Sequence, residues 1–348
     1  GMAPGTVRNT MSRHPGIQVL RALAAIMVLV GHVLAEAEHY FDQSFALSGL
    51  PWTRGEDSFI VISGCIITLS ASRIRGTRHA SLRFIWHRIL RVVPLYYLFT
   101  TLMLAALVFV PGGVKDTVLD PAQVISSYLF VPYERYDGRI APILSLGWTL
   151  NYEMFFYGIM AFALALPRGA AFVAAIGVLS GLSVIGLIVR PDQTMLAFWT
   201  NPIILTFVFG ILIARAQMAG LTRKKGGVVV FAIGLGGLVV LNTMVSGLPR
   251  FISSGIPAAF IVAAPVLFSE QTWAPRIGIV LGDASYALYL SHRFVLRAAT
   301  LILLPFLPAS PLAALLFTVL VCGAAILAIV CVYYRIEKPM LRWAEQWR

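Results

Sequence analysis

The chain has 348 residues, of which 59% are hydrophobic and only 12% are charged. Soluble domains carry about 25% charged residues, so this composition excludes an ordinary soluble protein. The formal net charge of +12 is compatible with a nucleic-acid-binding protein. Long apolar runs recur along the whole chain, however, and most of the basic residues lie between them. We therefore expect a membrane protein with no nucleic-acid partner.

Apolar segments along the chain predict about ten transmembrane helices. In chain order they cover residues 17–35, 58–72, 93–110, 148–166, 170–189, 195–214, 227–246, 251–268, 278–304 and 311–333. The longest polar stretch, residues 111–147, is too short to bury a core of its own. The sequence therefore predicts an all-α polytopic integral membrane protein with a single domain over residues 1–348.

Lysine and arginine are distributed unevenly between alternate loops. Of the 27 basic residues, 18 fall in the termini and in one set of loops, six fall in the opposite set, and three lie inside predicted spans. The positive-inside rule then places both termini in the cytoplasm. A cleaved signal peptide is the alternative for the first span, with Arg8 and Arg13 before it and "LAEAE" behind it. The N-in, C-in parity of the charges favours a retained helix.

Two ionisable residues lie inside the first predicted span, "LRALAAIMVLVGHV". Arg21 and His32 are eleven residues apart, which places both on one face of a helix and about 16 Å apart along its axis. Ionisable groups at membrane depth are costly and are rare without a function. We therefore treat this pair as a candidate functional site.

The predicted orientation divides the polar residues into two layers. His32, Asp57, Glu153 and His292 fall in the outer half of the membrane. The cytoplasmic side carries basic and mixed clusters around the third and last spans: Arg83, His87, Arg88, Arg91, Arg335, Glu337 and Lys338. This layout suits a substrate that is anionic at its cytoplasmic end and reacts near the outer side.

Structural roles are the alternatives for these residues. Arg21, His292 and Arg293 are candidates for snorkelling, His32 for packing, Glu153 for structural pairing, Asp57 for helix capping and Trp148 for interfacial anchoring. The 73–91 cluster also satisfies the topology rule by itself. The three cysteines, Cys65, Cys322 and Cys331, lie in apolar spans, so we expect no disulfide and no metal site.

Six short motifs follow one another along the chain. They are an Arg and a His separated by ten residues (Arg21, His32), "DSFIVISG" (Asp57, Ser63, Gly64), "RILRVVP" (Arg88, Arg91, Pro94), "WTLNYEMFFY" (Trp148, Thr149, Leu150, Glu153, Phe156, Tyr157), "GDASYALYLSH" (Gly282, Ser285, Tyr286, Leu288, Tyr289, Leu290, His292) and "EKP" (Glu337, Pro339). In this order and at these depths the chain resembles the membrane-bound acyltransferase 3 family, which O-acylates surface glycans and some lipids or antibiotics. "GWTLNYEMFFYG" is most similar to the exopolysaccharide acetyltransferases of that family.

The resemblance implies transfer of an acyl group, with acetyl favoured, from acetyl-CoA to a hydroxyl of an extracytoplasmic or lipid-linked glycan. It also implies a bacterial inner (cytoplasmic) membrane protein without a metal. We expect Arg21, Arg88 and Arg91 to bind the anionic donor. His32 is expected to act as a general base or a transient acyl carrier.

Glu153 is expected to hydrogen-bond to the second imidazole nitrogen of His32 and so fix its tautomer. Five further residues are expected to line the acceptor site: Asp57, Trp148, Tyr157, Tyr289 and His292. Membrane lipids and the glycan are the expected partners, and the sequence specifies no oligomeric state.

Two other functional classes use the same residue types. A transporter or proton-coupled channel would employ the intramembrane His, Glu and Arg side chains as a relay. A lipid-linked glycan flippase or a non-catalytic scaffold in glycan assembly is the third hypothesis. Binding and hydrolysis of acetyl-CoA would distinguish the acyltransferase from both.

Overall fold

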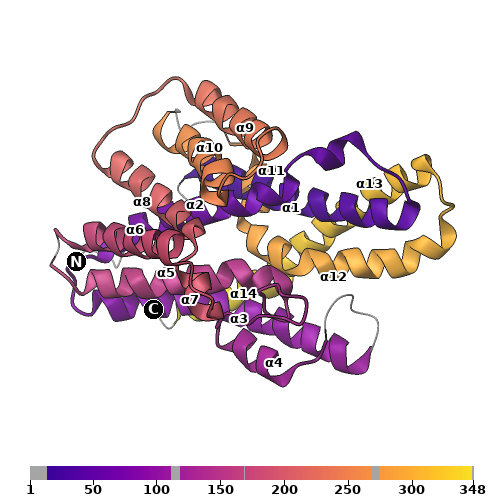
Figure 1. Ribbon diagram of the computed structural model, residues 1–348, viewed down its shortest axis with the longest axis horizontal. Coiled ribbons are helices and arrows are strands. Elements are labelled where there is room, and N and C mark those ends of the chain that lie inside the picture. The colour runs from indigo at the N-terminus through magenta and orange to yellow at the C-terminus, as the bar shows by residue number, and fades with distance from the viewer. Residues whose placement is uncertain (1–13, 111–117, 168, 269–273, 347–348) are drawn as a thin grey trace, which may run out of the picture.

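A computed structural model describes residues 14–110, 118–167, 169–268 and 274–346. Within these ranges the regular structure is helical, apart from one isolated bridge between Glu134 and Ile140. The α-helices are α1 (Pro15–Phe41), α2 (Gly55–Ile74), α3 (Ala80–Phe109), α4 (Pro121–Tyr128), α5 (Trp148–Leu164), α6 (Ala171–Val189), α7 (Thr194–Trp199), α8 (Leu205–Met218), α9 (Gly227–Thr243), α10 (Ile256–Leu267), α11 (Arg276–Asp283), α12 (Ser285–Leu303), α13 (Pro311–Val332) and α14 (Lys338–Glu345) (Figure 1).

Short helical segments connect or extend these helices. Five are 3₁₀ turns in the described ranges: η2 (Ala46–Gly49), η3 (Trp52–Arg54), η4 (Ser145–Gly147), η5 (Pro202–Ile204) and η7 (Leu304–Phe306). Two are π-helical, η6 (Phe251–Gly255) before α10 and η8 (Tyr333–Glu337) after α13. Five of the basic residues counted above, Arg8, Arg13, Lys115, Arg168 and Arg348, lie outside the described residues.

Seven helical stretches in the described ranges are long and apolar enough to cross a membrane. They are Pro15–Phe41, Trp52–Ile74, Ala80–Phe109, Ala171–Val189, Thr194–Met218, Ser285–Phe306 and Pro311–Glu345. Gly227–Thr243 and Phe251–Leu267 are shorter apolar helices, and α5 has 17 residues. The architecture is therefore that of a polytopic membrane protein, while the count of ten and the orientation stay predictions.

Three predicted spans differ in continuity or extent from the helices of the structure. The segment 278–304 is two helices, α11 and α12, which meet at Ala284. The segment 195–214 is interrupted at Pro202, where the Asn201 side chain accepts a hydrogen bond from the Ile203 amide (3.0 Å). Conversely, α3 runs unbroken for 30 residues through Pro94. Arg88 and Arg91 therefore belong to the same helix as the third predicted span.

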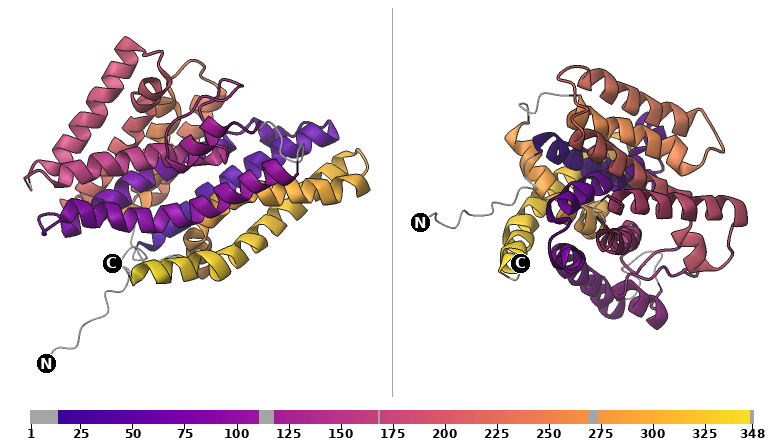
Figure 2. Two further views of the ribbon diagram at one scale, coloured as in Figure 1. Left: turned by 90° about the horizontal axis from the view of Figure 1, so that it is seen from below. Right: turned by 90° about the vertical axis from the view of Figure 1, so that its left-hand side faces the viewer.

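The longest helices run side by side, and α1 lies among them (Figure 2). It contacts α2, α10, α11, α12 and α13. Helices α9 and α10 pack against each other, and α10 also contacts α1 and α2 (Figure 1). Helices from both halves of the chain therefore surround α1, and its Arg21 side chain is buried among them.

The segment between α3 and α5 is held against α3. Tyr96 donates a hydrogen bond to the Ser127 carbonyl (3.0 Å), and the Ser127 hydroxyl accepts one from the Ile143 amide (2.9 Å). Nearer the tip of the loop, hydrogen bonds from Arg139 lower the pKa of the exposed Asp137 carboxyl to about 2. These contacts fix the backbone that leads into α5.

Two glycines allow close packing of α2 against α8. A Cβ added at Gly64 would lie 2.5 Å from the Phe207 carbonyl oxygen. A Cβ added at Gly210 would lie 2.7 Å from the Cys65 amide nitrogen and would also meet the Val61 carbonyl oxygen. Small residues allow this backbone approach, as they do at many membrane helix interfaces.

Gly210→Ala is expected to lower the melting temperature of the detergent-purified protein, because overpacking of this kind costs about 1–3 kcal/mol. The matched control is Gly158→Ala on α5, where nothing lies within 4 Å of an added Cβ. The control should melt like the wild type in thermal denaturation. Equal melting of both variants would contradict the close contact of α2 with α8.

Candidate functional site

A cavity of about 100 Å³ lies where α1, α2, α3, α5 and α12 meet. Its charged lining residues are Arg21 from α1, Arg88 and Arg91 from α3, and Glu153 from α5. Three cations and one carboxylate give this arginine cavity a net positive charge. Its volume is about the liquid share of three water molecules, so a thin anionic or polar chain fits it better than a bulky group.

The arginines are placed by helix periodicity and by aromatic neighbours. Arg88 and Arg91 are three residues apart on α3 and so share one face. The Arg88 guanidinium is buried, 5.6 Å from the ring centre of Phe84 and 5.8 Å from that of Tyr157. Rings at this distance stabilise a cation by their quadrupole and hold it in position.

Arg21 is also buried, and its guanidinium lies 3.4 Å from the Gln18 side-chain oxygen. The carboxylates of Glu337, Asp283 and Glu153 lie near enough to act favourably on its charge, while Arg91 opposes it. The cation is therefore balanced by acidic groups from α5, α11 and the π-helical segment η8.

Glu153 does not make the expected hydrogen bond to His32. Its Oε1 accepts hydrogen bonds from Tyr157 (2.5 Å) and from Ser63 (3.2 Å), and the side chain lines the arginine cavity. The sequence correctly suggests that this carboxylate needs partners, but its position on α5 turns it toward the cations. Tyr157, expected at the acceptor site, lies at the same cavity.

The partner of His32 is His292 on α12. His32 Nδ1 and His292 Nε2 are 3.1 Å apart, and the two ring centres are 5.2 Å apart. His292 is buried, while His32 is partly exposed. The structure therefore brings together two residues that the sequence placed in the same layer but assigned to different tasks.

The hydrogen bonds determine the tautomers of this histidine pair. His292 Nδ1 lies 3.0 Å from the Leu288 carbonyl oxygen, which only accepts, so a neutral His292 carries its proton on Nδ1. Its Nε2 then accepts from His32 Nδ1–H. The proton of a neutral His32 is thus on Nδ1, and its Nε2 is the unprotonated nitrogen. A base with a fixed tautomer is what general base catalysis requires.

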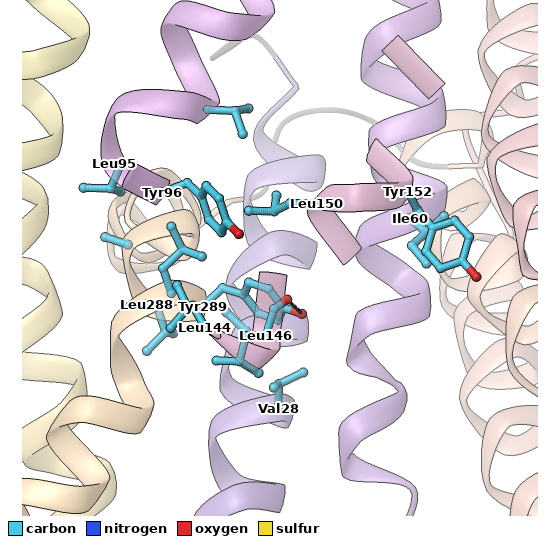
Figure 3. Close-up of a cluster of buried hydrophobic side chains, with 14 of the residues drawn as sticks. Val28, Ile60, Leu95, Tyr96, Leu144, Leu146, Leu150, Tyr152, Leu288 and Tyr289 are labelled. Atoms are coloured by element: carbon cyan, nitrogen blue, oxygen red, sulfur yellow. Dashed lines mark hydrogen bonds between the residues drawn. The ribbon is translucent and has the colours of Figure 1, made fainter. Parts of the chain in front are cut away.

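Tyr289 lies between the arginine cavity and the histidine pair. It lines the cavity, and its ring centre is 6.5 Å from that of His292. Its hydroxyl donates to the Leu146 carbonyl (3.0 Å) and accepts from Thr149 (3.1 Å). Figure 3 shows Tyr289 among buried side chains that include Leu144 and Leu146. The ring forms the boundary between the two polar centres.

Asp57 forms an ion pair with Arg250, which the sequence analysis did not predict. Arg250, just before the π-helical segment η6, donates from Nε to Asp57 Oδ1 (3.0 Å) and from Nη2 to Oδ2 (2.9 Å). The same Nη2 is 3.2 Å from Glu56 Oε2, and the guanidinium lies 5.0 Å from the Trp148 ring centre. Asp57 is fully buried and caps no helix. The expected acceptor contacts of Asp57 and Trp148 are therefore covered by Arg250.

Two further residues lie in this region that the sequence analysis did not assign to the site. Glu56 is buried, accepts from Arg250, and has its Oε1 3.4 Å from the Tyr289 hydroxyl. Ser285 lines the arginine cavity, and its buried hydroxyl has no hydrogen-bond partner among the described residues. The adjacent acidic residues of "GED" are a signal for Glu56, because two neighbouring carboxylates next to an apolar span need a cation.

Comparisons with known proteins cover most of the chain. The profile of a family described as "Acyltransferase domain" matches residues 14–334. This range includes all the helices that contribute to the arginine cavity and to the histidine pair. The exopolysaccharide production protein ExoZ of Rhizobium meliloti (strain 1021) is 34% identical over 296 residues, which are 83% of this chain and 89% of that protein. No solved structure matches the chain.

Arg250→Ala is expected to destabilise the protein by about 3–5 kcal/mol, because it leaves the buried Asp57 carboxylate without its cation. Arg250→Ala combined with Asp57→Asn should recover a large part of that loss. The control is Arg139→Ala, which removes an exposed ion pair with Asp137 and should cost under about 1 kcal/mol. The free energy of unfolding is measured by denaturant titration. Equal losses in Arg250→Ala and Arg139→Ala would contradict the role of Arg250 in neutralising the buried Asp57 carboxylate.

Proposed function

The chain belongs to the acyltransferase 3 family, and from this premise we propose that it transfers an acyl group, with acetyl favoured, from acyl-CoA to a hydroxyl of an extracytoplasmic glycan. The observation that carries the proposal is the 3.1 Å contact between His32 Nδ1 and His292 Nε2, which makes Nε2 the unprotonated nitrogen of a neutral His32, on the same face of α1 as Arg21 of the arginine cavity. We also place the protein in a bacterial inner membrane, with the N-terminal end of α1 at the cytoplasmic side.

We propose that the acyl-CoA donor binds at the arginine cavity. Coenzyme A carries phosphates at one end, which Arg88, Arg91 and Arg21 would bind by charge-assisted hydrogen bonds. The cavity is narrow, so the nucleotide end stays at its basic rim and the thin pantetheine arm enters. The arm would follow the face of α1 past Tyr289, and the thioester would approach His32.

His32 is proposed to act as the general base. Its Nε2 takes the proton of the acceptor hydroxyl while the hydroxyl oxygen attacks the thioester carbonyl carbon. The new C–O bond forms, the C–S bond breaks, and the imidazolium returns the proton to the departing thiolate. An acetyl-imidazole on His32 Nε2, formed first and then cleaved by the hydroxyl, is the alternative route. Both routes need the same unprotonated nitrogen.

His292 and Glu153 have supporting roles in this proposal. His292 holds the proton of His32 on Nδ1 and would stabilise its ring orientation while Nε2 is protonated. Glu153 lies among the cavity cations, where it would offset the repulsion between Arg21 and Arg88 and fix Tyr157 and Ser63. The carboxylate is thus assigned to donor positioning and not to the base itself.

The acceptor is proposed to be an exopolysaccharide or its precursor, because the relative ExoZ is named for exopolysaccharide production. Tyr289 and His292 lie at the proposed reaction centre. Trp148 lies against the Arg250 guanidinium instead.

The first test compares variants of α1 with acetyl-CoA labelled in its acyl group. Arg21→Ala is expected to weaken donor binding by about tenfold or more, because a charge-assisted hydrogen bond contributes about 1.5–3 kcal/mol. His32→Ala should bind the donor normally and lose thioester hydrolysis by about 10²–10⁴-fold. Binding is measured by equilibrium dialysis and hydrolysis by release of labelled acetate.

The control is His39→Ala, a histidine on the same helix that is exposed and packs against Tyr40. It should bind and hydrolyse acetyl-CoA like the wild type. Normal hydrolysis by His32→Ala would exclude His32 as the base. A wild-type protein that neither binds nor hydrolyses acetyl-CoA would exclude acyl-CoA as the donor.

His292→Ala is expected to lower kcat by about tenfold or more with little change in KM for acetyl-CoA, because it frees the tautomer of His32 without touching the donor cavity. His292→Gln should recover part of the rate, since its side-chain oxygen can accept from His32 Nδ1–H. Loss of donor binding in His292→Ala, or no rescue by glutamine, would contradict a positioning role.

A further inference from the structure

Ser285, the first residue of α12, is a buried polar group in the wall of the arginine cavity. Its side chain is fully buried, and its hydroxyl has no hydrogen-bond partner in the described part of the chain. Of the buried side-chain polar atoms of the described residues in that state, this hydroxyl is the one that belongs to the cavity lining. Such a group costs free energy comparable to a lost hydrogen bond. The cavity therefore contains a polar group that a ligand can satisfy.

The break between α11 and α12 explains why this hydroxyl has no local acceptor. Helical serines and threonines often donate to the carbonyl four residues before them. Ser291 of α12 does so, with the Ala287 carbonyl at 2.6 Å. Four residues before Ser285 the chain is still in α11, and the two helices meet at Ala284. Nor does the Ser285 hydroxyl cap α12, which has no side-chain cap hydrogen bond.

Two hydrogen bonds tie the first turn of α12 to neighbouring elements. The Tyr286 hydroxyl donates to the Val92 carbonyl of α3 (2.8 Å). The Ala287 amide donates to the buried Glu337 carboxylate of η8. Ser285 therefore keeps a fixed position relative to α3, which carries two of the cavity's arginines.

Helix periodicity gives the distance from this hydroxyl to the histidine pair. Ser285 and His292 are seven residues apart, so they share one face of α12 and lie about 10 Å apart along its axis. A ring nitrogen of His292 lies 3.1 Å from one of His32. A group bound at Ser285 is therefore about 10 Å from the proposed reaction centre.

The pantetheine arm of coenzyme A has an amide at this distance from its thioester. The amide between the pantoyl and β-alanine units is nine bonds from the thioester carbonyl carbon, or about 11 Å in an extended chain. The inner amide is five bonds away, or about 6 Å, and falls short of Ser285. The nearest phosphorus is fourteen bonds away, or about 17 Å, which is close to the axial separation of Arg21 and His32.

We propose that the Ser285 hydroxyl forms a hydrogen bond with the amide between the pantoyl and β-alanine units of acyl-CoA, and so sets the depth at which the thioester stops beside His32. This inference rests on the proposed acyltransferase function. It adds a positioning residue that recognises the pantetheine arm, whereas Arg21, Arg88 and Arg91 recognise the phosphates.

The test measures binding to the purified full chain by equilibrium dialysis with two probes. They are acetyl-CoA and 3′-phosphoadenosine 5′-diphosphate, which is coenzyme A without its pantetheine arm. Ser285→Ala should weaken acetyl-CoA binding about tenfold, because it leaves an amide of the arm buried without a partner. Binding of the armless probe should not change, which also shows that the variant is folded. Arg91→Ala should weaken binding of both probes by a similar factor.

The matched control is Ser291→Ala, the same substitution in the same helix. The Ser291 hydroxyl is also buried, but it bonds to the Ala287 carbonyl, and it lies about 120° around the α12 axis from Ser285. This variant should bind both probes like the wild type.

A truncated donor tests which amide is recognised. S-acetyl-N-acetylcysteamine carries the thioester and the inner amide but lacks the amide assigned to Ser285. Ser285→Ala should lower kcat/KM for hydrolysis of acetyl-CoA about tenfold and leave that of the truncated thioester unchanged. Equal losses for both thioesters would overturn the amide contact.

The outcomes separate this inference from the proposed function. Wild-type affinity of Ser285→Ala for acetyl-CoA, in a protein that hydrolyses acetyl-CoA, would overturn the role of Ser285 and leave the acyltransferase in place. Weaker binding of both probes would also overturn it, because Ser285 would then act on the phosphates or on the fold. Probe binding as expected in a protein without hydrolysis would support the arm contact and overturn the acyl transfer.

Discussion

Close backbone contacts fix α1, and the rest of the site depends on them. A Cβ at Gly55 would lie 2.5 Å from the Ala24 carbonyl oxygen, and one at Gly282 would meet the Gln18 carbonyl oxygen. Helices α2 and α11 therefore rest directly on the backbone of α1 at two heights. The acidic pair Glu56 and Asp57 directly follows Gly55, and Ser285 comes three residues after Gly282. With α1 held in this way, Arg21 and His32 keep a constant separation.

The charges around α1 fall into groups that differ in how far they are neutralised. The carboxylate of Asp57 is neutralised by Arg250 within the same cluster, so it presents no free charge to a ligand. Glu153 balances part of the arginine cavity but leaves it positive. The histidine pair, in contrast, is bonded only through neutral groups. In the proposed reaction, an anionic donor would be attracted to one end of α1, while proton transfer would take place at the other.

The sequence predicts the relative positions of residues on one helix better than the contacts between residues of different helices. The shared face of Arg21 and His32 follows from helix periodicity alone, and so does that of Arg88 and Arg91. The His32–His292 contact joins residues 260 positions apart, and Asp57–Arg250 joins residues 193 apart. A depth estimate places such residues in the same layer, but the rotation of each helix decides which of them meet. Glu153 was therefore assigned to the wrong partner.

The two faces of α1 have a consequence for the kinetics of the proposed reaction. The arginine cavity lies on one face of this helix, and a second, apolar cavity lined by Leu20, Leu23 and Met27 lies on another. The two linings share no residue, so a donor in the first cavity leaves the second open. Direct transfer with His32 as general base needs donor and acceptor bound together and would give intersecting initial-rate plots, whereas an acetyl-imidazole intermediate would give parallel ones.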